Sequence, residues 1–285
     1  MISTASPTAL VAGCGDLGTE VALHLITTGE QVLGLRRRTH VLPPQVSGLS
    51  VDLTQQQPDL PDGSYRMLAV VLTADGSDQQ AYRATYLDGL RHTLDALDDA
   101  GRFPERAVLV SSTGVYGDAV GEIDESSPVR PTRPTHDVLL AAEDLFHCRL
   151  PHGTVLRLSG LYGPGRSTFI RTALTGQVRP RWTNRIHRDD AAAAIVHLLT
   201  GRLAGHDDAA PALLLGTDTE PASSLDVADH IRACRDLPPL TERGDLPPGR
   251  RLSSAALRST GFTFTHPTYR EGYRAVLTGE AKRHP

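Results

Sequence analysis

Three glycines near the start of the chain have the spacing of a phosphate-binding turn. Gly13, Gly15 and Gly18 form G-x-G-x-x-G directly after the apolar run 9–12. In such a turn the first glycine permits the tight bend and the second lets backbone approach a pyrophosphate. The third lets the following helix pack closely on the strand. We therefore predict a dinucleotide site here, with a purely structural glycine turn as the alternative.

The residues next to this turn extend the predicted site. The helical pattern begins at Asp16 and Leu17, and N–H groups at a helix N-terminus bind anions. A second apolar run, 32–35, ends in a row of arginines that includes Arg36 and Arg37. An acidic residue at that place binds the ribose diol of NAD, whereas a guanidinium fits the 2′-phosphate of NADP. The sequence favours NADP over NAD, and a solvated charge run is the alternative.

Three more residues are expected to line the cofactor site. Asp52 follows Val51 at the end of the third expected strand, in reach of an adenine. Thr73 and Ala74 follow the apolar run 67–72, which is typical of a parallel strand covered on both faces. Both residues then lie at the carboxyl edge of the sheet, where a ligand binds in such folds.

The elements that must position these residues alternate along the chain. This alternation predicts an α/β fold with a doubly wound parallel Rossmann sheet. We expect a dinucleotide-binding domain over 1–160 and a smaller C-terminal α/β substrate lobe over 161–285, with elements returning to the sheet. Apolar runs typical of strands occupy 9–12, 32–35, 67–72, 107–110, 154–158 and 213–215, and helical spacing occupies 17–25, 86–97, 139–146, 190–199 and 269–277.

Three further segments are predicted from local composition. Residues 117–135 are polar and rich in proline, which indicates a loop over the site. Phe262 and Phe264 alternate as in a strand. A helix is expected to begin at Ser223, because Ser223-x-x-Asp226 resembles a capping box.

Composition excludes several classes of function. The 285 residues carry a formal net charge of −4 and are 5% aromatic, so no basic surface is expected for nucleic acid. We see no signal peptide and no apolar run near the roughly 18 residues that a membrane span needs. The cysteines, Cys14, Cys148 and Cys234, give no disulfide framework, and we expect a cytoplasmic protein. His147, Cys148 and His152 match no familiar zinc spacing, so no metal is expected.

Three motifs follow the glycine turn in order: SSTGVYGD at 111–118, LRLSGLYGPGR at 156–166 and NRIHRDDAAAAIVHLL at 184–199. With them the chain resembles extended short-chain dehydrogenase/reductases, most of all their atypical, NAD-dependent epimerase/dehydratase-like branch. The resemblance covers nearly the whole length. It implies an enzyme of oxidoreductase type that acts on a small-molecule substrate, and a homodimer formed through two long helices of the nucleotide-binding part.

One pair of residues departs from that family. The family pattern has Tyr-x-x-x-Lys on a helix, usually with a glutamate four residues after the lysine. Glu143 sets this register and places Thr135 and Leu139 at the two positions. A tyrosine of pKa about 10 needs a nearby cation to act as an acid or base at neutral pH, and threonine cannot replace it. Either the register is misread, or another residue supplies the proton, or the chain does not carry out ordinary carbonyl reduction.

The resemblance also indicates substitutes for the missing pair. Ser112 matches the family's hydroxyl that holds a substrate oxygen. His136 is one residue beyond the tyrosine position and suits acid/base work at neutral pH, with an exposed histidine at the end of the loop as the alternative. Tyr116 is another candidate, with packing under the loop as its alternative. Tyr162 lies in the LYGPGR turn, near the place where the family binds its substrate.

Arg166 and Arg185 could hold a carboxylate or phosphate of the substrate as forks, with ordinary surface arginines as the alternative. The resemblance implies that the run IHRDD at 186–190, with His187 and Asp189, docks the last lobe on the sheet.

Three functions stay open at this level. The first is an NADP(H)-dependent enzyme with a non-standard acid/base or with water as the proton source. The second keeps the fold and performs an elimination, isomerisation or cyclisation, as in secondary metabolism. The third is a dinucleotide-sensing protein without catalysis.

Overall fold

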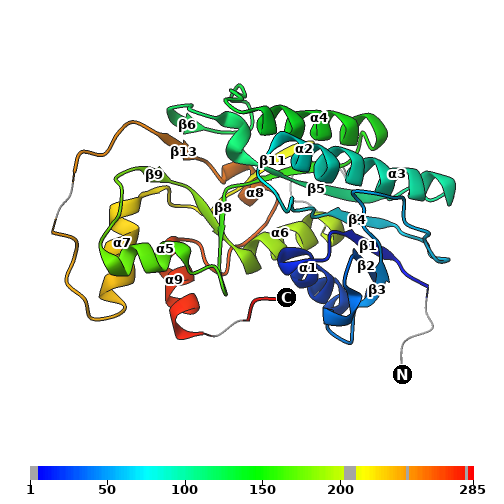
Figure 1. Ribbon diagram of the computed structural model, residues 1–285, viewed down its shortest axis with the longest axis horizontal. Coiled ribbons are helices and arrows are strands. Elements are labelled where there is room, and N and C mark those ends of the chain that lie inside the picture. Colours follow the sequence, from blue (N-terminus) through cyan, green and yellow to red (C-terminus); the bar gives the residue numbers. More distant parts are fainter. Residues whose placement is uncertain (1–5, 202–209, 242–243, 280–281) are drawn as a thin grey trace.

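Seven parallel strands form the central sheet, in the order β11-β7-β5-β4-β1-β2-β3. The computed structural model describes residues 6–201, 210–241, 244–279 and 282–285 (Figure 1). The strand order reverses between β1 and β4, which is the place where doubly wound sheets bind ligands. The strands are β1 (Ala9–Ala12), β2 (Val32–Arg36), β3 (Ser47–Ser50), β4 (Met67–Val70), β5 (Arg106–Ser112), β7 (Thr154–Leu158) and β11 (Leu213–Gly216).

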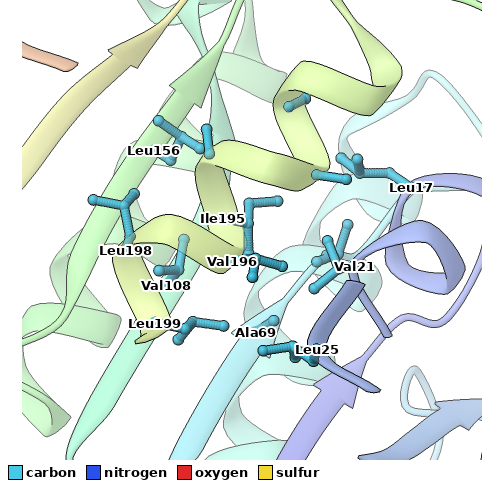
Figure 2. Packing of buried hydrophobic residues seen from close by; sticks show 14 of the residues in the cluster. Leu17, Val21, Leu25, Ala69, Val108, Leu156, Ile195, Val196, Leu198 and Leu199 are labelled. Atoms are coloured by element: carbon cyan, nitrogen blue, oxygen red, sulfur yellow. The ribbon is translucent and has the colours of Figure 1, made fainter. Parts of the chain in front are cut away.

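Helices cover both faces of this sheet, which confirms the predicted Rossmann fold (Figure 1). One face carries α1 (Asp16–Thr27) and α6 (Arg188–Thr200). Figure 2 shows Ile195 and Leu199 of α6 packed against Val108 of β5, with Leu25 of α1 beside them. The opposite face carries α3 (Gly89–Asp99) and α4 (Pro134–Arg149), whose apolar side chains form a second buried cluster.

The predicted helix over 86–97 is longer in the structure and contains a wider turn. It begins with α2 (Gln79–Tyr82) and continues through the π-helical turn η2 (Arg83–Asp88) into α3. The side chain of Asp78 caps its N-terminus by accepting the N–H of Ala81.

A second group of elements packs beside the carboxyl edge of the sheet. Its own apolar cluster is built from α5 (Thr168–Thr175), α7 (Ser224–Ala233) and α9 (Tyr269–Thr278). Ser223 caps α7, since its hydroxyl accepts the N–H of Asp226 at 3.1 Å. The short strands pair as β8 (Gly160–Tyr162) with β10 (Arg185–His187), β9 (Trp182–Thr183) with β12 (Ala222–Ser223), and β13 (Arg250–Leu252) with β6 (Gly121–Ile123). The remaining elements are η1 (Thr39–Val41), η3 (Thr113–Tyr116) and α8 (Ala255–Ser259).

Two local predictions were wrong. The segment 117–135 is not loop throughout, because β6 lies within it and pairs with β13 from the C-terminal part. Phe262 and Phe264 are not in a strand; they are buried against α6 in irregular backbone, with ring centroids 4.9 Å apart. Phe262 and Phe264 are buried while the residues on either side of them are exposed, and this alternation imitates the pattern of a strand.

No helix within the described ranges combines the length and apolar character needed to cross a membrane. Residues 1–5, part of the segment in which no signal peptide is expected, lie outside the described residues.

Candidate functional site

In the glycine turn between β1 and α1, the three glycines differ in the room that a side chain would have. Gly13 has φ +89°, and a Cβ there would lie 2.4 Å from the carbonyl oxygen of Val71. A Cβ at Gly18 would lie 2.3 Å from the carbonyl oxygen of Gly13. A Cβ at Gly15 would meet nothing within 4 Å. The outer glycines are therefore required by backbone packing, whereas Gly15 faces open space that a ligand could approach closely.

A cavity of about 230 Å³ opens beside this turn. Its walls include six of the residues predicted for the cofactor: Gly13, Gly15, Arg36, Arg37, Asp52 and Thr73. Four other predicted residues, Asp16, Leu17, Gly18 and Ala74, are not in its walls. Of these, Leu17 and Gly18 are buried in α1, so only backbone groups of the first turn could reach a ligand.

The two arginines at the end of β2 have different partners. Arg37 forms a double hydrogen bond with the carboxylate of Asp75, its Nη2 lying 3.0 Å from Oδ1. Arg36 donates from Nη2 to a main-chain oxygen of Pro285, the last residue, at 3.1 Å, while its Nη1 is buried without a partner. Burial lowers the pKa of Arg36. A buried N–H group without an acceptor is costly, so Arg36 has binding capacity left for an anion.

Asp52 and Cys14 shape the cavity. The Oδ1 atom of Asp52 accepts the backbone N–H and the hydroxyl of Thr54, at 3.0 and 2.7 Å. Burial raises the pKa of the Cys14 thiol to about 11, so the thiol stays protonated. Its Sγ would lie 2.8 Å from a Cβ at Gly34, which shows that Cys14 fills space between the turn and β2.

Asp16 faces the C-terminal part of the chain. Its carboxylate accepts from Arg166 at 2.9 Å and from Arg188 at 3.2 Å. It also accepts the backbone N–H of His284 at 3.2 Å. The side chain of Asp16 therefore fastens distant segments to the start of α1.

Ser112 and His136 meet above Gly114. The Ser112 hydroxyl, at the end of β5, accepts the N–H of Gly114 at 3.0 Å. His136 lies in the first turn of α4, and its Nδ1 accepts the N–H of Thr132 at 3.3 Å. A Cβ at Gly114 would lie 3.2 Å from Ser112 Oγ and 3.4 Å from His136 Nε2. Both atoms thus border the same space, although His136 is one residue beyond Thr135, the position of the family's tyrosine.

The protonation state of His136 follows from its surroundings. Burial lowers its pKa, and the charges of Arg133 and Arg250 lower it further. The neutral ring therefore predominates at pH 7. Because Nδ1 accepts a backbone N–H, the proton of this neutral ring is on Nε2. Ser112 and His136 together present two hydrogen-bond donors to one place.

The structure puts Tyr116 in the core, away from this place. Its ring is fully buried, and its hydroxyl accepts from Arg157 at 2.9 Å and donates to the carbonyl oxygen of Asp124 at 3.3 Å. Arg157 in turn pairs with Glu143, with Nη2 and Oε2 2.6 Å apart. Ser111 donates to the same carboxylate. Leu139, at the lysine position, is buried in the neighbouring apolar cluster.

Sequence reasoning missed Arg157 as the partner of Glu143. The signal was a cation at the fourth position of TVLRL, a strand whose five residues are all buried. A cation in such a strand requires a buried acidic partner. Asp218, the C-terminal segment 282–285 and Arg250 were also missed, and no local motif marks them.

Tyr162 borders a second cavity, of about 450 Å³, between β8 and α5. Its ring stacks on Tyr273 with centroids 4.6 Å apart, and its hydroxyl is buried without a partner. Burial raises the pKa of Tyr162, so the phenol stays protonated. Arg166 and Arg185 line the same cavity.

His187, Asp190 and His266 form a buried polar cluster whose nitrogen and oxygen atoms lie within 4.8 Å of one another. Asp190 accepts the N–H of Thr265 at 2.7 Å, and the N–H and Nδ1–H of His266 at 2.9 Å each. His187 caps α6 by accepting the N–H of Asp189. These contacts join α6 to residues 265 and 266 of the C-terminal part, and the docking role of the run 186–190 stays a prediction. His147 and His152 are instead bonded to the carbonyl oxygens of Ala212 and Pro104.

Solved structures of related fold extend over nearly the whole chain. One, from Methylobacillus flagellatus, is described as a candidate NAD-dependent epimerase/dehydratase; it is 33% identical, covers 97% of this chain and 99% of its own, and has a TM-score of 0.80. The UDP-glucuronic acid 4-epimerase of Bacillus cereus, solved with NAD, has a TM-score of 0.75 at 17% identity and covers 95% of each chain.

Sequence comparisons give the family. The protein YeeZ of Escherichia coli strain K12 is 33% identical over 209 residues, which are 69% of this chain and 74% of YeeZ. The sequence model of the NAD dependent epimerase/dehydratase family matches residues 9–234. The chain therefore belongs to the NAD-dependent epimerase/dehydratase family.

Proposed function

We propose that the protein is an NADP(H)-dependent enzyme of oxidoreductase type that acts on a small metabolite. The observation that carries this proposal is Arg36, whose Nη1 is buried and unpartnered in the wall of the cavity next to Gly15. No acidic residue occupies the end of β2, where an NAD-binding site has one. The open space at Gly15 and the first turn of α1 would hold the pyrophosphate.

The solved relative from Bacillus cereus contains NAD, so the choice of NADP rests on this chain's own arginine. Arg37 contributes less, because Asp75 already engages both of its terminal nitrogens. When bound, a nicotinamide dinucleotide supplies the hydride donor or acceptor.

Ser112 and His136 would act on the substrate oxygen. Their Oγ and Nε2 atoms lie 3.2 and 3.4 Å from the position that a Cβ on Gly114 would take, so a carbonyl oxygen that approaches from this side could accept from both. Fixed donors aimed at an oxygen that gains negative charge stabilise the transition state. A neutral histidine is suited to this role as a hydrogen-bond donor that keeps its proton, and water supplies the proton that the substrate oxygen finally takes up. This arrangement replaces the tyrosine and lysine of the family.

A non-redox reaction is the second candidate, and one observation favours it. Leu139 stands where the lysine would be and is buried among Val115, Tyr116 and other apolar side chains. A site without that cation could carry out an elimination or isomerisation in which Ser112 and His136 polarise the substrate.

Calorimetric titration of the protein with NADP(H) and NAD(H) separates these candidates. We expect NADP(H) to bind more tightly than NAD(H). Arg36→Ala should weaken NADP(H) by about ten- to hundredfold and leave NAD(H) nearly unchanged. Arg37→Ala is the matched control and should have a small effect on both. If neither dinucleotide binds, the oxidoreductase proposal fails and the non-redox reaction becomes the better one.

Two further properties belong to this proposal. A cytoplasmic location fits the free thiols of Cys14, Cys148 and Cys234. A homodimer through α3 and α4 follows from the family resemblance, and light scattering on the purified protein would test it.

A further inference from the structure

Residues 282–285, which we call the C-terminal strap, lie against the start of α1 (Figure 1). The backbone N–H of His284 donates to Oδ1 of Asp16 at 3.2 Å, and its Nε2 lies 2.6 Å from Oε2 of Glu20. Hydrogen bonds from His24 and His284 lower the pKa of Glu20, so its carboxylate stays charged at neutral pH. Because a hydrogen bond to a charged carboxylate is stronger than one between neutral groups, His284 fastens the strap to α1.

Two other contacts show the path of the strap. The carbonyl oxygen of Lys282 accepts from Nη1 of Arg188 at 3.2 Å. The side chain of Arg283 lies over Gly165, where a Cβ would be 2.6 Å from Cδ of the arginine. Gly165 and Arg283 both line the cavity beside Tyr162. The strap therefore runs from that cavity, across the start of α1, toward the glycine turn.

The far end of the strap occupies part of the candidate cofactor site. A main-chain oxygen of Pro285 accepts from Nη2 of Arg36 at 3.1 Å. Arg36 lines the cavity next to Gly15, and its Nη1 remains without a partner. A guanidinium binds a phosphate most strongly when two of its N–H groups donate in parallel. With Nη2 engaged by the strap, the fork of Arg36 is only partly available to a 2′-phosphate.

The strap leaves the pyrophosphate position open. A Cβ at Gly15 would meet no atom within 4 Å. The strap and a dinucleotide therefore compete for Arg36 and not for the glycine turn. NADP carries a phosphate at the ribose 2′ position, whereas NAD has a hydroxyl there that needs no guanidinium. Only NADP(H) should have to displace the strap.

We propose that the C-terminal strap regulates the choice of cofactor: Pro285 occupies Arg36 until a 2′-phosphate displaces it, so the strap weakens NADP(H) binding and leaves NAD(H) binding unchanged. A ligand binds only the fraction of molecules whose site is free, and its apparent Kd rises as that fraction falls. This inference rests on the proposed function, because it takes Arg36 as the site of the 2′-phosphate.

Calorimetric titration of His284→Ala with NADP(H) and with NAD(H) tests the strap. The variant loses the bond to Glu20 and should free Arg36 more often, so we expect the Kd for NADP(H) to fall by about three- to tenfold. The Kd for NAD(H) should not change. His24→Ala is the matched control, because His24 lies 3.2 Å from the other oxygen of the same carboxylate but belongs to α1. It should alter neither Kd.

Trypsin measures the release of the strap directly, since the strap contains the cleavage sites Lys282 and Arg283. Mass spectrometry of the intact chain follows the loss of the residues beyond them. We expect saturating NADP(H) to speed this loss in the wild type and NAD(H) to leave it unchanged. His284→Ala should be cleaved rapidly without any ligand.

Several outcomes would overturn the inference. Weaker NADP(H) binding in His284→Ala, or protection of Lys282 by NADP(H), would make the strap part of the cofactor site. An equal gain for both dinucleotides would place the competition at the pyrophosphate. Equal NADP(H) affinity in wild type and His284→Ala would also overturn it, while tight binding in both would leave the proposed cofactor standing. Absence of dinucleotide binding in both proteins would overturn the inference and the proposed function together.

Discussion

At the scale of single residues, Ser112 and His136 are the pair whose roles are most directly testable. Both border the space above Gly114. Once a substrate is found by screening carbonyl compounds with NADPH, Ser112→Ala and His136→Phe should each lower kcat by about 10²–10³, because each removes one donor to the charged oxygen. NADP(H) affinity should stay the same in both variants.

His136→Gln is the matched control for His136→Phe. Both variants remove the Nδ1 acceptor of Thr132, but glutamine keeps an N–H donor at the end of its side chain. We expect His136→Gln to recover part of kcat. Equal losses in the two variants would show that the N–H donor is not what His136 contributes.

Asp218 gives a prediction on stability and pH. In the unfolded chain its carboxyl ionises near pH 3.8, whereas in the folded protein burial raises the pKa to about 8. Between these values the folded state binds more protons than the unfolded state. The free energy of unfolding should therefore fall as pH rises from about 4 to about 8. Asp218→Asn cannot ionise and should remove this part of the slope.

Urea unfolding of the wild type and of Asp218→Asn at pH 5, 6.5 and 8 measures the difference. We expect the variant to gain stability relative to the wild type as pH rises. Parallel curves for the two proteins would mean that Asp218 is ionised in the folded state, and Arg185 would then have a counter-charge.

At the scale of elements, the buried pair Arg157–Glu143 joins β7 to α4 across the sheet face. The side chains of Arg157 and Glu143 are 8% and 7% exposed. Arg157→Met leaves Glu143 buried without its cation and should lower the free energy of unfolding by about 3–5 kcal/mol. Adding Glu143→Leu removes the stranded charge and should restore much of that loss, as urea unfolding can show. A double variant as unstable as the single one would point to lost packing instead.

This pair also shows how far the sequence could predict the fold. The strand Ala9–Ala12, an unbroken apolar run, was predicted at its observed position because burial on both faces leaves a clear local pattern. The strand Thr154–Leu158 was also predicted at its observed position, although Arg157 interrupts its apolar residues. The role of Glu143 was not predicted, because its partner Arg157 lies on another element. Local composition also could not reveal that β6 pairs with β13, whose residues lie more than a hundred positions away.

In the candidate site, too, the features with a local sequence pattern were predicted, and those that depend on contacts between distant segments were not. The glycine turn and Arg36 are local and were predicted to meet, and both line one cavity. That His136 lies near Ser112 depends on how α4 packs on the sheet. The position of His136 one residue after Thr135 in the sequence does not predict this packing. Asp218 has no local signal, since its raised pKa arises mainly from burial, which depends on the whole fold.

At the scale of the whole molecule, the start of α1 is joined to the C-terminal part by a cluster of charges. Arg188, at the N-terminus of α6, is 2% exposed and pairs with Asp16 at 3.2 Å and with Glu20 at 3.3 Å. His284 bonds to Glu20 at 2.6 Å. Arg166, in the wall of the cavity beside Tyr162, pairs with the same Asp16. These ion pairs fix the glycine turn around Gly15 relative to the cavity that Arg185 lines.

Asp16→Asn tests whether this aspartate stabilises the assembly or binds the cofactor. Removing its charge leaves Arg188 and Arg166 with one carboxylate fewer, so the free energy of unfolding should fall by about 1–3 kcal/mol. The affinity of the folded protein for NADP(H) should change little, because Asp16 offers a ligand only its backbone N–H. Thermal unfolding and calorimetric titration of the same preparation measure both quantities. A large loss of affinity without a loss of stability would instead make the Asp16 side chain part of the cofactor site.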